Sequence, residues 1–173
     1  MADGRESSER FGELGADAAA FLRTRGSLLG IRAADVGTWD SPLPGRDYRG
    51  ADLTSADLSG HHFKGYDFRA ARLRLATLDG AFFLRCRFVG ADLRGTSLRR
   101  ASFAACELMD ADFRDADLTG ARFGVASDTT GWLGCDLTGA QLQGATLRGI
   151  DVHPNTRWTN GALGGEPDQL GRE

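Results

Sequence analysis

The chain has 173 residues, of which 41% are hydrophobic and 26% are charged, and its formal net charge is −3 at pH 7. This length and apolar content suit a single domain with a buried core. No apolar run is long enough to span a membrane, and no basic start precedes an apolar stretch, so we expect a cytoplasmic protein without a membrane span or secretory signal. Twenty arginines against one lysine, Lys64, are typical of a GC-rich, bacterial genome.

The first 40 residues are predicted to form a helix and a capping segment. Between residues 5 and 25, apolar residues recur at helical spacing, and Gly26 follows where a helix C-cap is expected. The members of this apolar face are Phe11, Leu14, Ala18, Phe21 and Leu22. We expect residues 1–40 to cap the domain that follows.

From Leu43 to Phe123, every fifth residue is Leu, Phe or Tyr, seventeen times without interruption. A step of five turns an α-helix by roughly 500°, so these residues would wander around a helix. On a straight strand, an odd step would send alternate members to opposite faces. The period fits a chain that turns a corner after each five-residue side, so that every central residue points at one axis. We therefore predict an all-β solenoid over residues 41–154.

The number of sides follows from which residue fills each central position. Central residues 20 positions apart are identical in nine of thirteen pairs, against five of sixteen pairs at a spacing of 5, so we expect four sides per coil. Residues 20 apart would then stack at the strand spacing of roughly 4.8 Å. The predicted core consists of Leu53, Leu58, Phe63, Phe68, Leu73, Leu78, Phe83, Phe88, Leu93, Leu98, Phe103, Leu108, Phe113, Leu118, Phe123, Leu137, Leu142 and Leu147.

The rest of each unit is also patterned. Two positions before the centre, the residue is Ala in ten of seventeen units, which indicates a cramped inward position. Asp often precedes the centre, as in Ala91-Asp92-Leu93, where we expect it to face water, and Gly often ends the unit, as at Gly80. This unit resembles that of the pentapeptide-repeat family, usually written Ala-Asp/Asn-Leu/Phe-X-Gly. The resemblance covers residues 41–125 and resumes at residue 135, and it implies a right-handed, four-sided β-helix.

Some positions depart from the family unit. Arg46, His61 and Tyr66 are too polar or too large for the Ala position, so we expect distorted coils near the start. Residues 126–134 stand in place of two units but number nine, one short of register. We predict a bulge or loop with Trp132 folded back over the coil, either a tolerated insertion or a recognition loop. Residues 155–173 are expected to form a C-terminal cap and a frayed end, with Trp158 as a lid.

No catalytic, cofactor-binding or metal-binding constellation stands out. Cys86 and Cys106 occupy the small position 20 residues apart, and Cys135 occupies it later, so we expect buried free thiols, with a disulfide or a metal site as alternatives. His61 and His62 are adjacent, so a β-structure would point one inward and the other outward. Without a metal-binding or nucleophile motif, we predict a protein that is not an enzyme and needs no cofactor.

Two sides of the predicted coil could carry an interaction surface. One directs Phe82 and Leu84 outward, an apolar patch that would receive the N-terminal helix, a partner or a second copy in a homodimer. Another stacks Arg74, Arg94 and Arg114 among Asp residues, which would either compensate one another or contact an anion. Trp132 in the break is the last candidate.

The preferred hypothesis is a protein-binding scaffold with an unknown partner. The family resemblance implies an alternative, because some members resemble duplex DNA in shape and charge, engage DNA gyrase and protect it from antibiotics. Such mimicry needs an acidic surface, yet residues 46–125 carry 13 basic and 11 acidic side chains, a net charge of +2. Direct nucleic-acid binding is not expected, since no basic stripe is interleaved with aromatic residues.

Overall fold

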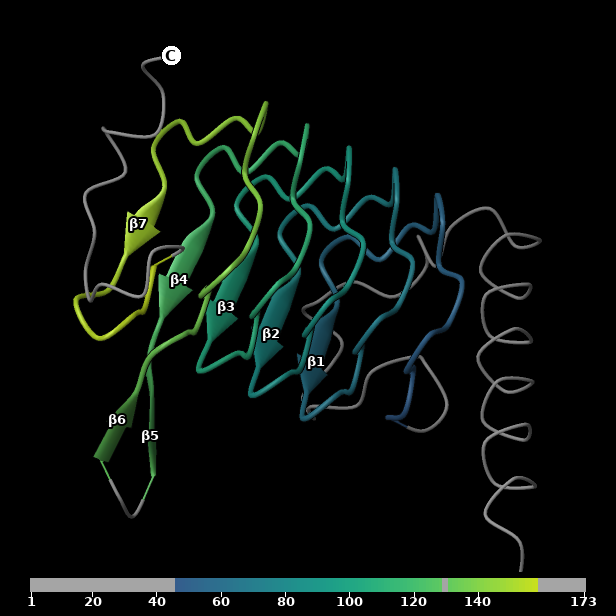
Figure 1. Ribbon diagram of the computed structural model, residues 1–173. Coiled ribbons are helices and arrows are strands. Elements are labelled where there is room, and N and C mark those ends of the chain that lie inside the picture. The colour runs from purple at the N-terminus through teal and green to yellow at the C-terminus, as the bar shows by residue number, and fades with distance from the viewer. Residues whose placement is uncertain (1–45, 129–130, 159–173) are drawn as a thin grey trace, which may run out of the picture.

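The computed structural model describes residues 46–128 and 131–158. The chain winds into a β-solenoid whose coils stack along one axis (Figure 1). One side of the coil, here called the sheet side, is a five-stranded parallel sheet. Its strands, in order, are β1 (His62–Lys64), β2 (Phe82–Leu84), β3 (Ser102–Ala104), β4 (Arg122–Gly124) and β7 (Asp151–Val152).

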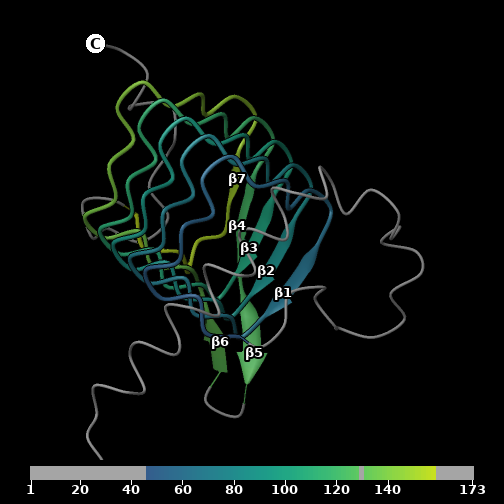
Figure 2. The ribbon, with the colours of Figure 1, turned by 90° about the vertical axis from the view of Figure 1, so that its right-hand side faces the viewer.

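Three further sides complete each coil. We number them in chain order after the sheet side as the second, third and fourth sides. On each of them, isolated parallel bridges join one coil to the next. Examples are Arg87 with Glu107 on the second side, Arg72 with Asp92 on the third, and Thr77 with Ser97 on the fourth. These partners are 20 residues apart, which confirms the predicted coil of four five-residue sides. Figure 2 shows the coils from the end, with the sides following one another around the axis.

The core lies on the axis that the sides enclose. Sixteen of the eighteen predicted central residues are at most 1% exposed, whereas Leu142 and Leu147 in the last coil are only partly buried. The sheet side contributes a column of stacked rings: the centroids are 5.0 Å apart for Phe63 and Phe83, 4.9 Å for Phe83 and Phe103, and 5.3 Å for Phe103 and Phe123. Because successive coils differ by whole turns, identical side chains can pack in register.

The residues between the centres form the corners. The last residue of the unit has a left-handed φ at ten glycines and at eight other residues of the described chain, so glycine is favoured there but not required. Where Asp precedes the centre, it does more than face water. The backbone N–H of Thr54 donates to Asp52 Oδ1 at 3.1 Å, and that of Thr119 donates to Asp117 Oδ1 at 3.0 Å. Asp thus caps the turn that follows it.

The break in the period is a β-hairpin that leaves the coil at one corner. Strand β5 (Ala126–Asp128) pairs antiparallel with β6 (Gly131–Leu133), and Figure 1 shows the hairpin extending away from β4. Glu107 pairs with Asp136, 29 residues later, so nine residues are added to a coil of 20 and no side is lost. The expectation that two units are replaced is therefore wrong. The hairpin pairs its own backbone groups, so it interrupts none of the parallel ladders.

The C-terminal end of the described chain closes onto the last coil. Arg157 bridges Asp136, and Trp158 is 3% exposed with its ring edge-on to Phe123 at 6.0 Å. The predicted helix at residues 5–25, the rest of the 1–40 segment and the end of the chain after residue 158 lie outside the described residues. Within the described part, no helix is long and apolar enough to cross a membrane.

Candidate functional site

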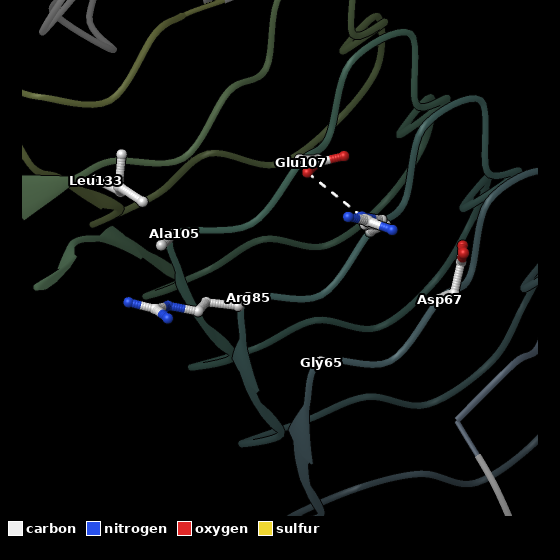
Figure 3. A pocket seen from close by; sticks show the side chains of 7 residues that line it. Gly65, Asp67, Arg85, Ala105, Glu107 and Leu133 are labelled. Atoms are coloured by element: carbon white, nitrogen blue, oxygen red, sulfur yellow. Dashed lines mark hydrogen bonds and ion pairs between the residues drawn. The ribbon is translucent and has the colours of Figure 1, made fainter. Parts of the chain in front are cut away.

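A groove runs along the corner between the sheet side and the second side. Its volume is about 350 Å³, and we call it the corner groove. Its lining comes from three successive coils and the hairpin: Gly65, Asp67, Arg85, Arg87, Ala105, Glu107 and Leu133. In Figure 3, Leu133 and Asp67 lie toward opposite ends, with Glu107 between them. The hairpin therefore bounds a hollow that the coil alone would leave open.

The groove exists because the corner residues on either side of Arg85 are small. Gly65, Arg85 and Ala105 occupy equivalent corners, with φ values of 69°, 52° and 52°. Such a corner can hold a long side chain, as Arg85 shows. Gly65 and Ala105 have no long side chain, so the surface beside them is hollow. Leu133 at the end of β6 is 46% exposed and forms the apolar wall beside Ala105.

Charges line the groove in compensating rows. Arg87 Nε lies 3.4 Å from Glu107 Oε1, and both side chains are about half exposed. Asp67 Oδ2 lies 2.6 Å from Arg69 Nη2, just outside the groove. Although burial pushes in the opposite direction, the hydrogen bonds and charge of Arg69 hold the pKa of Asp67 below its usual value. Asp67 is thus ionised and held by Arg69. Arg87 and Glu107 lie farther apart and are half exposed, so either side chain can form an ion pair with another group instead.

The predicted apolar patch borders the same corner. Phe82 and Leu84 lie on β2 as the half-buried, outward residues, and Leu84 pairs in register with Ala104 of β3. The ring of His62 meets Phe82 edge-on at 5.8 Å. Leu84 directly precedes the groove residue Arg85, so patch and groove form one continuous surface.

The predicted arginine ladder lies elsewhere, on the third side. Arg94 contacts Asp92 at 2.6 Å and Asp112 at 3.5 Å, and Arg114 contacts Asp112 at 2.6 Å. Hydrogen bonds from these arginines hold the pKa values of Asp92 and Asp112 below their usual range. Arg74 is exposed on the same side. These contacts favour mutual compensation over an anion site.

The remaining candidates are not brought together with this surface. Trp132 belongs to β6, but its side chain lies outside the described part of the structure. Cys86, Cys106 and Cys135 are buried and free, and burial raises the pKa of Cys106 well above its usual value. Each thiol donates to a sheet-side carbonyl, at 3.4 Å to Phe63, 3.4 Å to Phe83 and 3.3 Å to Phe103. With its pKa raised in this way, the buried thiol of Cys106 stays protonated and unreactive.

Histidines and metal ligands add no second site within the described residues. His61 is turned inward: its two ring nitrogens are buried and have no hydrogen-bond partner among the described residues. His62 lies on the outward face of β1. In residues 46–128 and 131–158, no three His, Cys, Asp or Glu side chains are grouped so that they could hold a metal ion.

Sequence reasoning missed the groove residues. Asp67, Arg87 and Glu107 stack on the second side at spacings of 20, so their column could have been read from the sequence. The small corner residues Gly65 and Ala105 were also visible as equivalents 40 positions apart. The period could not predict the apolar wall of the groove, because Leu133 belongs to the hairpin, outside the repeat.

Three comparisons with known proteins bear on identity. No curated protein matches the chain in sequence. Among solved structures, it is similar to a pentapeptide repeat protein from Nostoc Pcc 7120, with 27% identity, a TM-score of 0.46, and coverage of 62% of this chain and 85% of that one. A pentapeptide repeat protein from the thylakoid lumen of Arabidopsis thaliana has 30% identity and a TM-score of 0.34, covering 60% of this chain and 66% of that one.

QnrB1, a plasmid-mediated fluoroquinolone resistance protein, is more distant, with 22% identity, a TM-score of 0.25, and coverage of 62% of this chain and 79% of that one. The family profile described as pentapeptide repeats matches eight copies, over residues 49–83, 86–124 and 132–153. These matches span more than half of the chain and coincide with the coils described above. The chain therefore belongs to the pentapeptide-repeat family.

Proposed function

We propose that this chain is a non-enzymatic protein-binding scaffold that presents its sheet side and the adjoining corner to a protein partner. The observation that carries the proposal is the outward pair Phe82 and Leu84 on β2, beside a groove walled by the exposed Leu133. Apolar side chains gathered on an otherwise polar surface mark interaction sites. The stacked coils hold this surface rigid, which lowers the entropic cost of binding.

DNA gyrase is a less favoured partner than an unidentified protein. A DNA mimic needs unpaired acidic charge on its surface, but Asp67, Asp92 and Asp112 each form an ion pair with an arginine of their own unit. The charge that such a mimic would present is therefore largely compensated within each side. A second copy of the chain is a further partner that the same apolar patch would suit.

The test is affinity capture from cells that encode the protein, using the wild type and two variants. Leu84→Lys places a charge in the patch, and Lys64 already occupies the same position one coil earlier, so the variant should fold. Val89→Lys, at the equivalent position of the second side, is the matched control. We expect a partner that the wild type and Val89→Lys retain and that Leu84→Lys loses. Capture that is identical for all three proteins would contradict the proposed surface.

Gyrase is tested separately by a supercoiling and drug-stabilised cleavage assay, with the purified protein titrated from substoichiometric amounts to large excess. We expect no effect at any concentration. Protection or inhibition at low micromolar levels would make gyrase the partner. Size-exclusion chromatography with light scattering on the same preparation measures whether a second copy occupies the patch.

A further inference from the structure

We propose that the corner groove binds an extended, acidic peptide segment of the partner protein. The proposal rests on the proposed function and names its site and the chemistry of the segment. Its support comes from the shape of the groove, the state of its backbone groups and its charge.

The groove matches a short extended segment in size. Gly65, Arg85 and Ala105 belong to successive coils, so the corner positions span roughly 10 Å at the strand spacing of about 4.8 Å. An extended chain covers that distance in about three residues at roughly 3.3 Å per residue. The volume of about 350 Å³ lies at the lower end of the range of ligand pockets.

The backbone N–H groups at this corner already donate to the next coil, so a segment cannot bind by adding a strand that accepts from them. The N–H of Gly65 donates to the carbonyl of Leu84 at 2.9 Å, and that of Arg85 donates to the carbonyl of Ala104 at 2.9 Å. Ala105 donates to the carbonyl of Gly124 at 3.4 Å. With these donors occupied, we look to the side chains that line the groove for recognition.

Among those side chains, Arg87 is the group that can bind a negative ligand. The groove contains Arg85, Arg87, Asp67 and Glu107, and Arg69 neutralises Asp67 from just outside. The two cations and two anions of the lining thus balance one another. A ligand carboxylate can compete for Arg87, because the contact of that residue with Glu107 is 3.4 Å long and half exposed. An arginine–carboxylate pair formed in its place would be shorter and bidentate.

The end of the groove near the hairpin favours an apolar side chain. Leu133 is exposed there beside Ala105. Leu84 of the apolar patch follows on β2, paired in register with Ala104 of β3. Burying these apolar surfaces against a ligand side chain stabilises binding. The expected segment therefore carries an acidic residue for Arg87 and an apolar residue for Leu133.

The experiment selects random heptapeptides displayed on phage against the immobilised full chain, and measures the enriched peptides by fluorescence polarisation. Ala105→Leu fills the groove, and Leu75, at a corner with φ 57°, shows that leucine fits this backbone. Ala70→Leu, at φ 53° on another corner, is its control. Arg87→Glu removes the cation, and Arg72→Glu, whose 3.4 Å pair with Asp52 is equally long, is the second control.

We expect the enriched peptides to combine Asp or Glu with a large apolar residue. Ala105→Leu and Arg87→Glu should each weaken binding by about tenfold or more, and both controls should change it by less than about twofold. Circular dichroism checks that all four variants are folded. Replacing the acidic residue with Lys should abolish binding to the wild type.

Three results would overturn the inference: no enrichment over the blank surface, peptides without acidic residues, or binding that groove and control variants weaken equally. Displacement of the peptides by a DNA duplex that itself depends on Arg87 would assign the groove to nucleic acid instead. The experiments distinguish a wrong groove assignment from a wrong scaffold function. If Leu84→Lys loses a captured partner while Ala105→Leu does not, the scaffold function stands and the groove assignment falls.

Discussion

Phe83→Ala should be among the most destabilising substitutions in the coil. The Phe83 side chain is 1% exposed, and its ring stacks on Phe63 at 5.0 Å and on Phe103 at 4.9 Å and meets Phe88 edge-on at 5.1 Å. Truncation leaves a cavity in the middle of the column, and such substitutions cost about 3–5 kcal/mol. Lost contacts between aromatic rings belong to that cost, because each is worth about 0.5–1.5 kcal/mol.

Phe82→Ala is the matched control, because Phe82 is the preceding residue of the same strand and points outward. It should cost roughly 1 kcal/mol or less, since no core cavity is formed. The assay is urea unfolding followed by circular dichroism and tryptophan fluorescence, with midpoints and m-values compared. If Phe83→Ala and Phe82→Ala lowered the free energy of unfolding equally, the inward and outward assignment of β2 would be wrong.

Two further stability predictions use other parts of the coil. Gly134→Ala should cost roughly 1–3 kcal/mol in urea unfolding, because its Cβ would collide with the backbone carbonyl of Asn155, whereas Gly124→Ala, with no neighbour nearer than 3.7 Å, should be nearly neutral. Equal losses would contradict the close approach of these segments. Stability should also fall as the pH drops from about 4 toward 2, because the hydrogen bond from Thr119, aided by a nearby arginine, lowers the pKa of Asp117 to about 2. The unfolded state takes up the proton first, so acid favours unfolding. Asp117→Asn should make the fall in melting temperature across this range less steep, while Asp67, Asp92 and Asp112, whose pKa values are also lowered, keep part of it.

The repeating part of the fold could be predicted because one physical demand recurs in every unit. A central Leu or Phe with a small residue two positions earlier can only meet its equivalents on a common axis, so the period fixed the sides and the core from Leu53 to Leu137. Equivalent corners and columns, such as those of Gly65 and Ala105, followed from the same count.

The rest depended on interactions between units. Nine residues can interrupt a coil by replacing sides or by leaving it at a corner, and only the pairing of Glu107 with Asp136 distinguishes the two. The capping role of Asp52 and Asp117 was readable in principle, since a turn follows each of them. The groove was not, because it needs Leu133 from the hairpin beside Ala105 from the coil.

The most direct test of the proposed working surface is site-specific photo-crosslinking in cells that encode the protein. Leu133 and Leu75, 46% and 62% exposed, are the exposed large hydrophobic residues of the described chain, and they lie at different corners. A photoreactive amino acid replaces each in turn, and crosslinked proteins are identified by mass spectrometry. We predict a crosslinked partner from position 133 and none from position 75. A partner crosslinked from position 75 alone, or equally from both, would contradict the assignment of the sheet side and corner groove as the binding surface.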